Sequence, residues 1–144
     1  MKLQDAIVSA AKKHGIDEVL VIYTSKIDMR PWIGEKARLR HPGSEPLPLE
    51  RARSLVKDYG QCALVIGKDV AGFTAALKAI EDDLHKNGFY KAWAITNAQL
   101  GECADIHCHE ALGIDIVATL QRYKKNVKIP LPGEYPPWGI VLLE

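Results

Sequence analysis

The segment Cys62-Ala-Leu-Val-Ile66 is a run of five apolar residues between two amphipathic stripes, and it indicates the class of fold. Before it, apolar side chains of residues 49–59 recur at helical spacing, and the stripe ends at Gly60. After it, a second helical stripe covers residues 70–84. A short apolar run between two helices is typical of a buried strand. This part of the chain therefore predicts helix, strand and helix in succession.

The same alternation extends over the rest of the chain. Apolar spacing predicts a further helix over residues 3–14, and three more apolar runs are predicted as strands: 19–23, 90–95 and 138–143. Strands that alternate with helices favour right-handed crossovers and a sheet with helices packed on it. We therefore predict an α/β fold, a single domain over residues 1–144, with a central mixed sheet of about four or five strands flanked by helices. Because a proline-rich stretch precedes the last run, an antiparallel edge position is an alternative for that strand.

Two segments are less regular. Residues 24–46 show neither helical nor strand periodicity, which is compatible with a long functional loop or with an extra strand around Ala37 to Arg40. Residues 102–125 are predicted to be mostly helical, with a break near Gly113. Asp115 is then expected to cap the second piece of helix by accepting a backbone N–H.

Composition places the chain among soluble proteins of a reducing compartment. Of its 144 residues, 47% are hydrophobic and 26% charged, and the net charge of +1 gives no bulk attraction to nucleic acid or to an anionic membrane. Three cysteines without a repeating spacing indicate free thiols. The N-terminal residues lack the apolar core of a signal peptide, and no apolar run approaches the roughly 20 residues of a membrane span. We expect a cytoplasmic protein without nucleic-acid or membrane partners.

Potential metal ligands are concentrated between residues 103 and 110. If this segment is helical, Cys103 and His107 lie one turn apart, and Glu110 extends the same stripe. Thiolate, imidazole and carboxylate together suit zinc or iron, so Cys103, His107 and Cys108 are the first candidate ligands, with His109 and Glu110 in reserve. Three cysteines are too few for an iron–sulfur cluster held by cysteine alone. The alternative is that the cysteines pack as small apolar residues and the histidines are solvated.

Four stretches carry a resemblance to a known family: Tyr59-Gly-Gln-Cys-Ala-Leu-Val-Ile66, Asn87-Gly-Phe-Tyr-Lys-Ala-Trp93, Glu110-Ala-Leu-Gly-Ile-Asp-Ile-Val-Ala-Thr119 and Trp138-Gly-Ile-Val-Leu-Leu143. In this order the chain, over residues 30–144, resembles the cysteine-rich "predicted metal-binding protein" family, domain of unknown function twenty-two eighty-four. Members of that family are small proteins found mainly in anaerobic bacteria and archaea. The resemblance implies metal or iron–sulfur binding.

The chain departs from this family in its cysteines. The family's first cluster, with a Cys-Pro-Pro element, falls where residues 36–48 contain no cysteine, and of its second cluster only Cys103 and Cys108 remain. We therefore expect a divergent, cysteine-depleted member. Its function would be metal binding or, alternatively, that of a metal-free binding or assembly module that uses the 24–46 loop and the Trp-containing Pro-rich segment. The module would contact a protein partner or a second copy of the chain.

A cysteine, a histidine and two basic patches outside residues 103–110 also have functional potential. Cys62 begins a buried strand and is expected to be inert core, and His41 is expected to be a surface histidine. Basic residues form two patches that can meet phosphates or an acidic partner. No glycine-rich phosphate loop, nucleophile elbow or His-Glu-x-x-His sequence is present, and whether the protein is an enzyme stays open. The patches are Arg30, Trp32, Lys36, Arg38 and Arg40, and Arg122, Lys124, Lys125 and Lys128.

Overall fold

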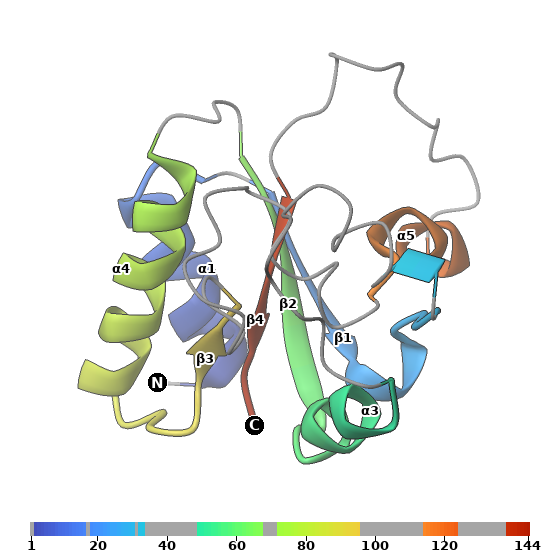
Figure 1. Ribbon diagram of the computed structural model, residues 1–144. Helices are drawn as coiled ribbons and strands as arrows, with labels where there is room; N and C mark the ends of the chain where they lie inside the picture. The colour runs from blue at the N-terminus through green and yellow to red at the C-terminus, as the bar shows by residue number, and fades with distance from the viewer. Residues whose placement is uncertain are drawn as a thin grey trace, which may run out of the picture.

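A four-stranded sheet forms the centre of the structure (Figure 1), in the order β1-β2-β4-β3. The computed structural model describes residues 2–16, 18–30, 32–33, 49–67, 72–95, 114–123 and 138–144. Every neighbouring pair of strands is antiparallel. The strands are β1 (Glu18–Tyr23), β2 (Gln61–Ile66), β3 (Trp93–Ala94) and β4 (Trp138–Leu142).

Three of the four predicted strands are confirmed nearly at their predicted bounds, and the α/β class is confirmed as well. The third predicted strand, 90–95, is much shorter than expected. Residues 90 and 91 form a turn, and only Trp93 and Ala94 pair with β4. The N–H of Ala94 instead donates to the buried carboxylate of Glu81 at 2.9 Å, so a side chain takes the place of another strand.

The prediction of a mixed sheet is wrong for the described strands, because β4 lies between β2 and β3. Both neighbours are antiparallel to β4, so β2 and β3 run in the same direction, as a crossover through α4 (Phe73–Lys86) implies. The inserted strand turns one potential parallel pair into two antiparallel pairs. For the same reason, the last strand is antiparallel as considered but does not lie at an edge.

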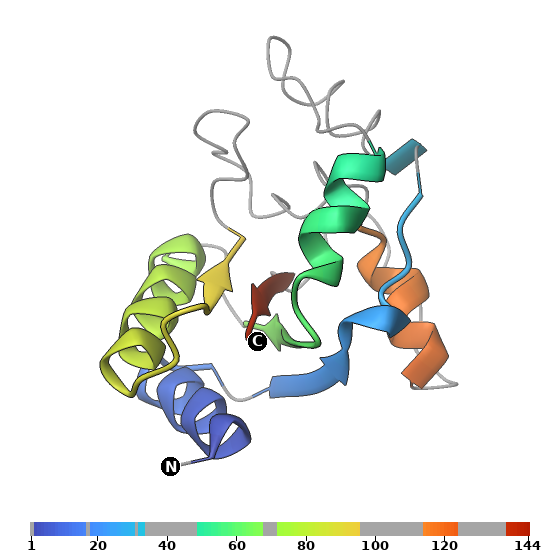
Figure 2. The same cartoon turned by 90° about the horizontal axis from the view of Figure 1, so that it is seen from below.

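Helices cover both faces of the sheet (Figures 1 and 2). On one face lie α1 (Leu3–Lys13) and α4, and on the other lie α3 (Leu49–Lys57) and α5 (Ile116–Tyr123). The helices predicted over 3–14, 49–59 and 70–84 are confirmed to within a few residues, as is the second helical piece after Gly113. Among the helices of the described segments, none is long and apolar enough to cross a membrane.

The strands have apolar side chains on both faces, and these alternate between two separate cores. In β2, Ala63 and Val65 pack with α1 and α4, whereas Cys62 and Leu64 pack with α3 and α5. β4 alternates in the same way, and all its residues are buried. Strands that are covered on both faces show continuous rather than alternating hydrophobic sequence, which explains why these runs were recognisable.

Gly139 in β4 lies directly beneath two side chains of α4. A Cβ atom at this position would stand 2.6 Å from Cδ1 of Leu77 and 3.2 Å from Cε1 of Phe73. Both of these side chains are almost fully buried, so they have little room to move away. The absence of a side chain at residue 139 therefore sets the distance between α4 and the sheet.

Gly139→Ala is expected to lower the free energy of unfolding by about 1–3 kcal/mol, the usual cost of overpacking a core. Denaturant unfolding of the variant measures this. Leu77→Ala, which removes the nearest atoms, is expected to cost less in the Gly139→Ala background than in the wild type. Strictly additive effects of the two substitutions would contradict the close approach.

Candidate functional site

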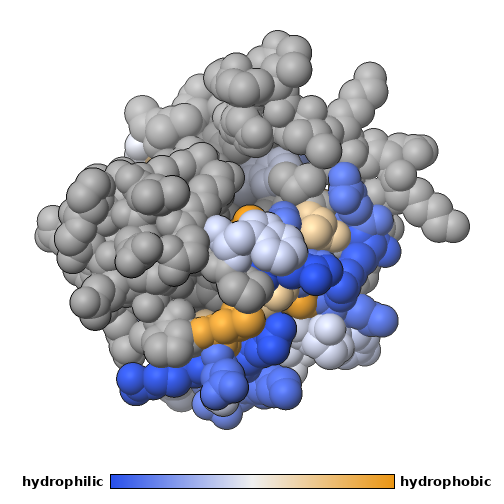
Figure 3. All heavy atoms as spheres, turned by 45° about the vertical axis from the view of Figure 1, so that its right-hand side comes forward, coloured by the Kyte–Doolittle hydropathy of each residue, from blue (hydrophilic) through white to orange (hydrophobic). Residues whose placement is uncertain are grey.

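A pocket of about 720 Å³ opens between α3, α5 and residues 23–30. Its size lies in the range of about 300–1,000 Å³ that is usual for small-molecule sites. Residues 24–30 run from the end of β1, through the short 3-10 helix η1 (Thr24–Lys26), past α3 to α5 (Figures 1 and 2). Figure 3 shows this side of the molecule, where hydrophilic side chains lie next to a smaller hydrophobic group.

Positive charge dominates the lining of the pocket. Among the described lining residues, four side chains are cationic, namely Arg30, Arg53, Lys57 and Arg122, and Asp28 is the one carboxylate. The spacing of Arg53 and Lys57 by four residues puts them on one face of α3. Apolar side chains of Ile27, Met29 and Val56 also line the pocket, so it combines cationic and apolar surface.

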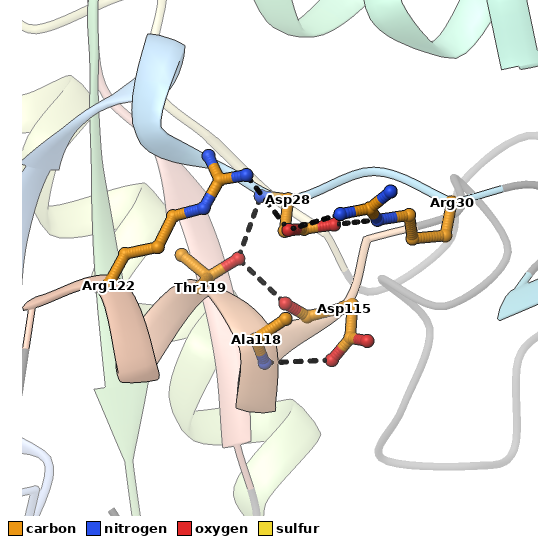
Figure 4. A network of polar contacts seen from close by, with 6 residues as sticks. All are labelled: Asp28, Arg30, Asp115, Ala118, Thr119 and Arg122. Atoms are coloured by element: carbon orange, nitrogen blue, oxygen red, sulfur yellow. Dashed lines mark hydrogen bonds and ion pairs between the residues drawn. The ribbon is translucent and has the colours of Figure 1, made fainter. Parts of the chain in front are cut away.

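Asp28 forms ion pairs with two of the four cationic side chains, Arg30 and Arg122. Its carboxylate is 5% exposed and accepts hydrogen bonds from Nε of Arg30 at 2.5 Å and from Nη2 of Arg122 at 3.0 Å (Figure 4). A second, longer contact joins Nη2 of Arg30 to Asp28 at 3.3 Å. The hydrogen bond to Asp28 and the charge of Asp28 raise the pKa of Arg30, so this guanidinium stays charged. Each arginine has five N–H donors, and the contacts with Asp28 leave donors on both for another acceptor.

The backbone of Asp28 is fixed to the beginning of α5. Its N–H donates to Oγ1 of Thr119 at 2.9 Å, and its C=O accepts from the N–H of Asp115 at 2.8 Å. The Thr119 hydroxyl in turn donates to the C=O of Asp115 at 2.7 Å, and an isolated bridge pairs Met29 with Ile114. Thr119 is fully buried. This network, drawn in Figure 4, positions the pair of arginines.

The capping role predicted for Asp115 is confirmed. Its Oδ1 accepts a hydrogen bond from the N–H of Ala118 at 3.0 Å, and its C=O accepts from the N–H of Thr119 at 3.0 Å. α5 begins at the next residue, Ile116. A carboxylate at this position also faces the positive end of the helix dipole.

Some of the predicted site residues lie within the described part of the chain, and the others lie outside it. Cys62 is fully buried, burial raises the pKa of its thiol to about 12, and its prediction as inert core is confirmed. Arg30 and Arg122, predicted in separate basic patches, meet at Asp28, and Arg30 lies 5.6 Å from the ring of Trp32. The five candidate metal ligands lie outside the described residues, as does His41: Cys103, His107, Cys108, His109 and Glu110. Lys36, Arg38, Arg40, Lys124, Lys125 and Lys128, and the extra strand considered around Ala37 to Arg40, also lie outside them.

Three charged residues of the pocket are not among the sequence predictions: Asp28, Arg53 and Lys57. The spacing of Arg53 and Lys57 along a helical stripe was a usable signal, because the apolar positions of that helix define its opposite face. Asp28 gave no such signal, since an aspartate in an irregular segment is ordinary.

Glu81, Asp82 and His85 are a potential metal-ligand group within the described residues, with one ligand atom of each within 4.8 Å of the others. All three have partners in the structure, and Asp82 lies 4.0 Å from Nζ of Lys78. Glu81 accepts the N–H of Ala94 and pairs with Lys78, and Nε2 of His85 lies 2.7 Å from the C=O of Ala92. These contacts tie α4 to the segment around β3, and they account for the group without a metal.

Comparisons of the chain with protein-family models, with curated proteins and with solved structures find no match. The resemblance to the cysteine-rich family stays a prediction from the four stretches quoted above.

Thr119→Val is expected to lower the free energy of unfolding by about 1–3 kcal/mol, because the buried N–H of Asp28 loses its acceptor while the shape of the side chain is kept. Amide hydrogen exchange should then be faster at Asp28. Thr119→Ser is the matched control, since it keeps the hydroxyl and loses one methyl group. Equal exchange rates at Asp28 in the two variants would contradict the role of the hydroxyl.

Asp115→Ala is expected to lower the free energy of unfolding by about 0.5–2 kcal/mol through loss of the cap, and to leave any zinc or iron content unchanged. Thermal denaturation and elemental analysis measure the two effects. Cys103→Ser is expected to do the reverse under the metal hypothesis, losing metal with a smaller effect on stability. If Asp115→Ala removed metal without affecting the metal-free protein, Asp115 would be a ligand rather than a cap.

Proposed function

We propose that this protein binds a small organic anion in the pocket between α3, α5 and residues 23–30. The observation that carries this proposal is the charge of the lining, with four cationic side chains and one carboxylate around about 720 Å³. A cavity lined mainly by one sign of charge concentrates ligands of the opposite sign. Arginine is also suited to carboxylate and phosphate groups, because its planar donors match two acceptor oxygens.

Two further features narrow the class of ligand. Ile27, Met29 and Val56 give the pocket apolar surface, which favours an organic molecule over a bare inorganic ion. The volume of about 720 Å³ is that of a small-molecule site. Binding fits this site better than acid–base catalysis, since both arginines already donate to the carboxylate of Asp28. This role differs from the binding or assembly module expected from the sequence, because the partner is a small molecule rather than a protein, although the first part of the 24–46 loop forms one wall of the pocket.

Metal binding is the second proposal, and the concentration of ligand types in residues 103–110 supports it. Zinc or iron would be held by Cys103, His107 and Cys108, with His109 and Glu110 as further candidates. Elemental analysis of protein purified anaerobically without chelator tests it, and a metal content far below one atom per chain would contradict it.

Citrate and pyrophosphate are expected to raise the melting temperature of the protein more than sodium chloride does at equal ionic strength, because a ligand that binds only the folded state stabilises it. Replacing Lys57 by Gln is expected to weaken citrate binding roughly fivefold, or by about 1 kcal/mol, as for a partly exposed ion pair. Differential scanning fluorimetry and calorimetric titration measure these changes.

Lys86→Gln is the matched control, because it removes the same charge at the end of α4, on the opposite face of the sheet. Its citrate affinity should equal that of the wild type. Equal weakening by Lys57→Gln and Lys86→Gln would mean that net charge alone attracts the anion, and would contradict a site in this pocket.

A further inference from the structure

The four cations of the pocket form two pairs that differ in how they are held. Arg30 and Arg122 come from segments far apart in the sequence and are fixed to the buried carboxylate of Asp28. Arg53 and Lys57 lie one turn apart on α3 and belong to exposed positions of that helix. Within the described residues, neither Arg53 nor Lys57 forms an ion pair with a carboxylate. The first pair is therefore preorganised, whereas no ion pair among the described residues orders the second pair.

We infer that the ligand is an organic dianion whose two acidic groups are separated by an apolar carbon skeleton. One acidic group would accept hydrogen bonds from the remaining donors of Arg30 and Arg122, and the other would meet Arg53 and Lys57. This inference deepens the proposed function and rests on it. It names the ligand class, a dicarboxylate or a phosphorylated carboxylic acid, by the chemistry that both share.

The number and placement of charges support two acidic groups rather than one. Asp28 already neutralises one unit of charge at the arginine pair, so a single carboxylate there would leave Arg53 and Lys57 without an anion. Bringing a second acidic group to the α3 pair is then an intramolecular step, which adds affinity without a further cost of association. Apolar side chains in the lining, Ile27 and Val56 among them, suit the methylene groups between the two acids.

The two cationic pairs are also expected to differ in how specifically each binds an acidic group of the ligand. A guanidinium held by a buried carboxylate has lost most of its conformational freedom before the ligand arrives, so it binds an acidic group with a smaller entropy loss. Lys57 is a flexible point charge and accommodates acids of different geometry. The arginine pair would therefore hold a monoacid by itself, and the α3 pair would act only on the second acid.

Calorimetric titration with straight-chain acids tests this inference. The probes are α,ω-dicarboxylates from succinate to suberate, the monocarboxylates of equal length, and ω-phosphonocarboxylates. We expect one diacid length to bind about tenfold more tightly than its matched monoacid, with weaker binding at shorter and longer lengths. In the Arg53→Gln/Lys57→Gln variant, the diacid should bind no more tightly than the monoacid, and the loss of affinity should be larger for the diacid than for the monoacid. Lys86→Gln should behave as the wild type.

The outcomes distinguish failure of the dianion inference from failure of the proposed anion binding. A preference for the phosphonocarboxylate or for the dicarboxylate identifies the source of the second acid, and either result supports the inference. Equal affinity for diacids and monoacids, or a diacid advantage that is independent of length and survives in the double variant, overturns the inference but leaves anion binding standing. If none of these acids, citrate or pyrophosphate binds, the proposed function fails together with the inference.

Discussion

The structure depends on the burial of β2 and β4 on both faces. Ala63, Val65 and Val141 need a cover on one side, and Leu64 and Ile140 need one on the other. Each strand supplies both sets in alternation, so neither layer of helices can be absent without exposing half of a core. On one face lie α1 and α4, and Gly139 leaves room for Leu77 and Phe73 of α4. On the other face, α3 and α5 lie beside the segment that forms the pocket.

The pocket follows from how this second layer is joined to the sheet. Residues 24–30 leave β1 and are fixed to α5 by the Asp28 and Thr119 hydrogen bonds rather than by apolar packing alone. A buried carboxylate that accepts from two arginines is compensated in charge, which makes its burial tolerable. The same arrangement orders the cations at the edge of a cavity. Stability and binding capacity therefore share a network, and Tyr23, at the end of β1, is the residue that the described strands contribute to the lining of the pocket.

The sequence allowed the central strands and helices to be predicted, but not their arrangement. Runs such as 62–66 are recognisable because burial on both faces leaves no polar positions in them. Strand order could not be predicted in this way, because the sequence of residues 138–142 does not indicate that this strand inserts between two earlier strands. The contact of Arg122 with Asp28 joins residues 94 positions apart, and no local spacing predicts such a pair.

The central position of β4 also determines when the sheet can be completed during synthesis. β1 and β2 can pair as soon as residue 66 has left the ribosome, but β3 has no sheet neighbour until residues 138–142 appear. Until then, the nascent chain exposes one edge of β2 and the apolar faces of helices that lack half of their support. The sheet of this architecture is therefore completed only once residues 138–142 have left the ribosome, and the chain exposes apolar surface until then.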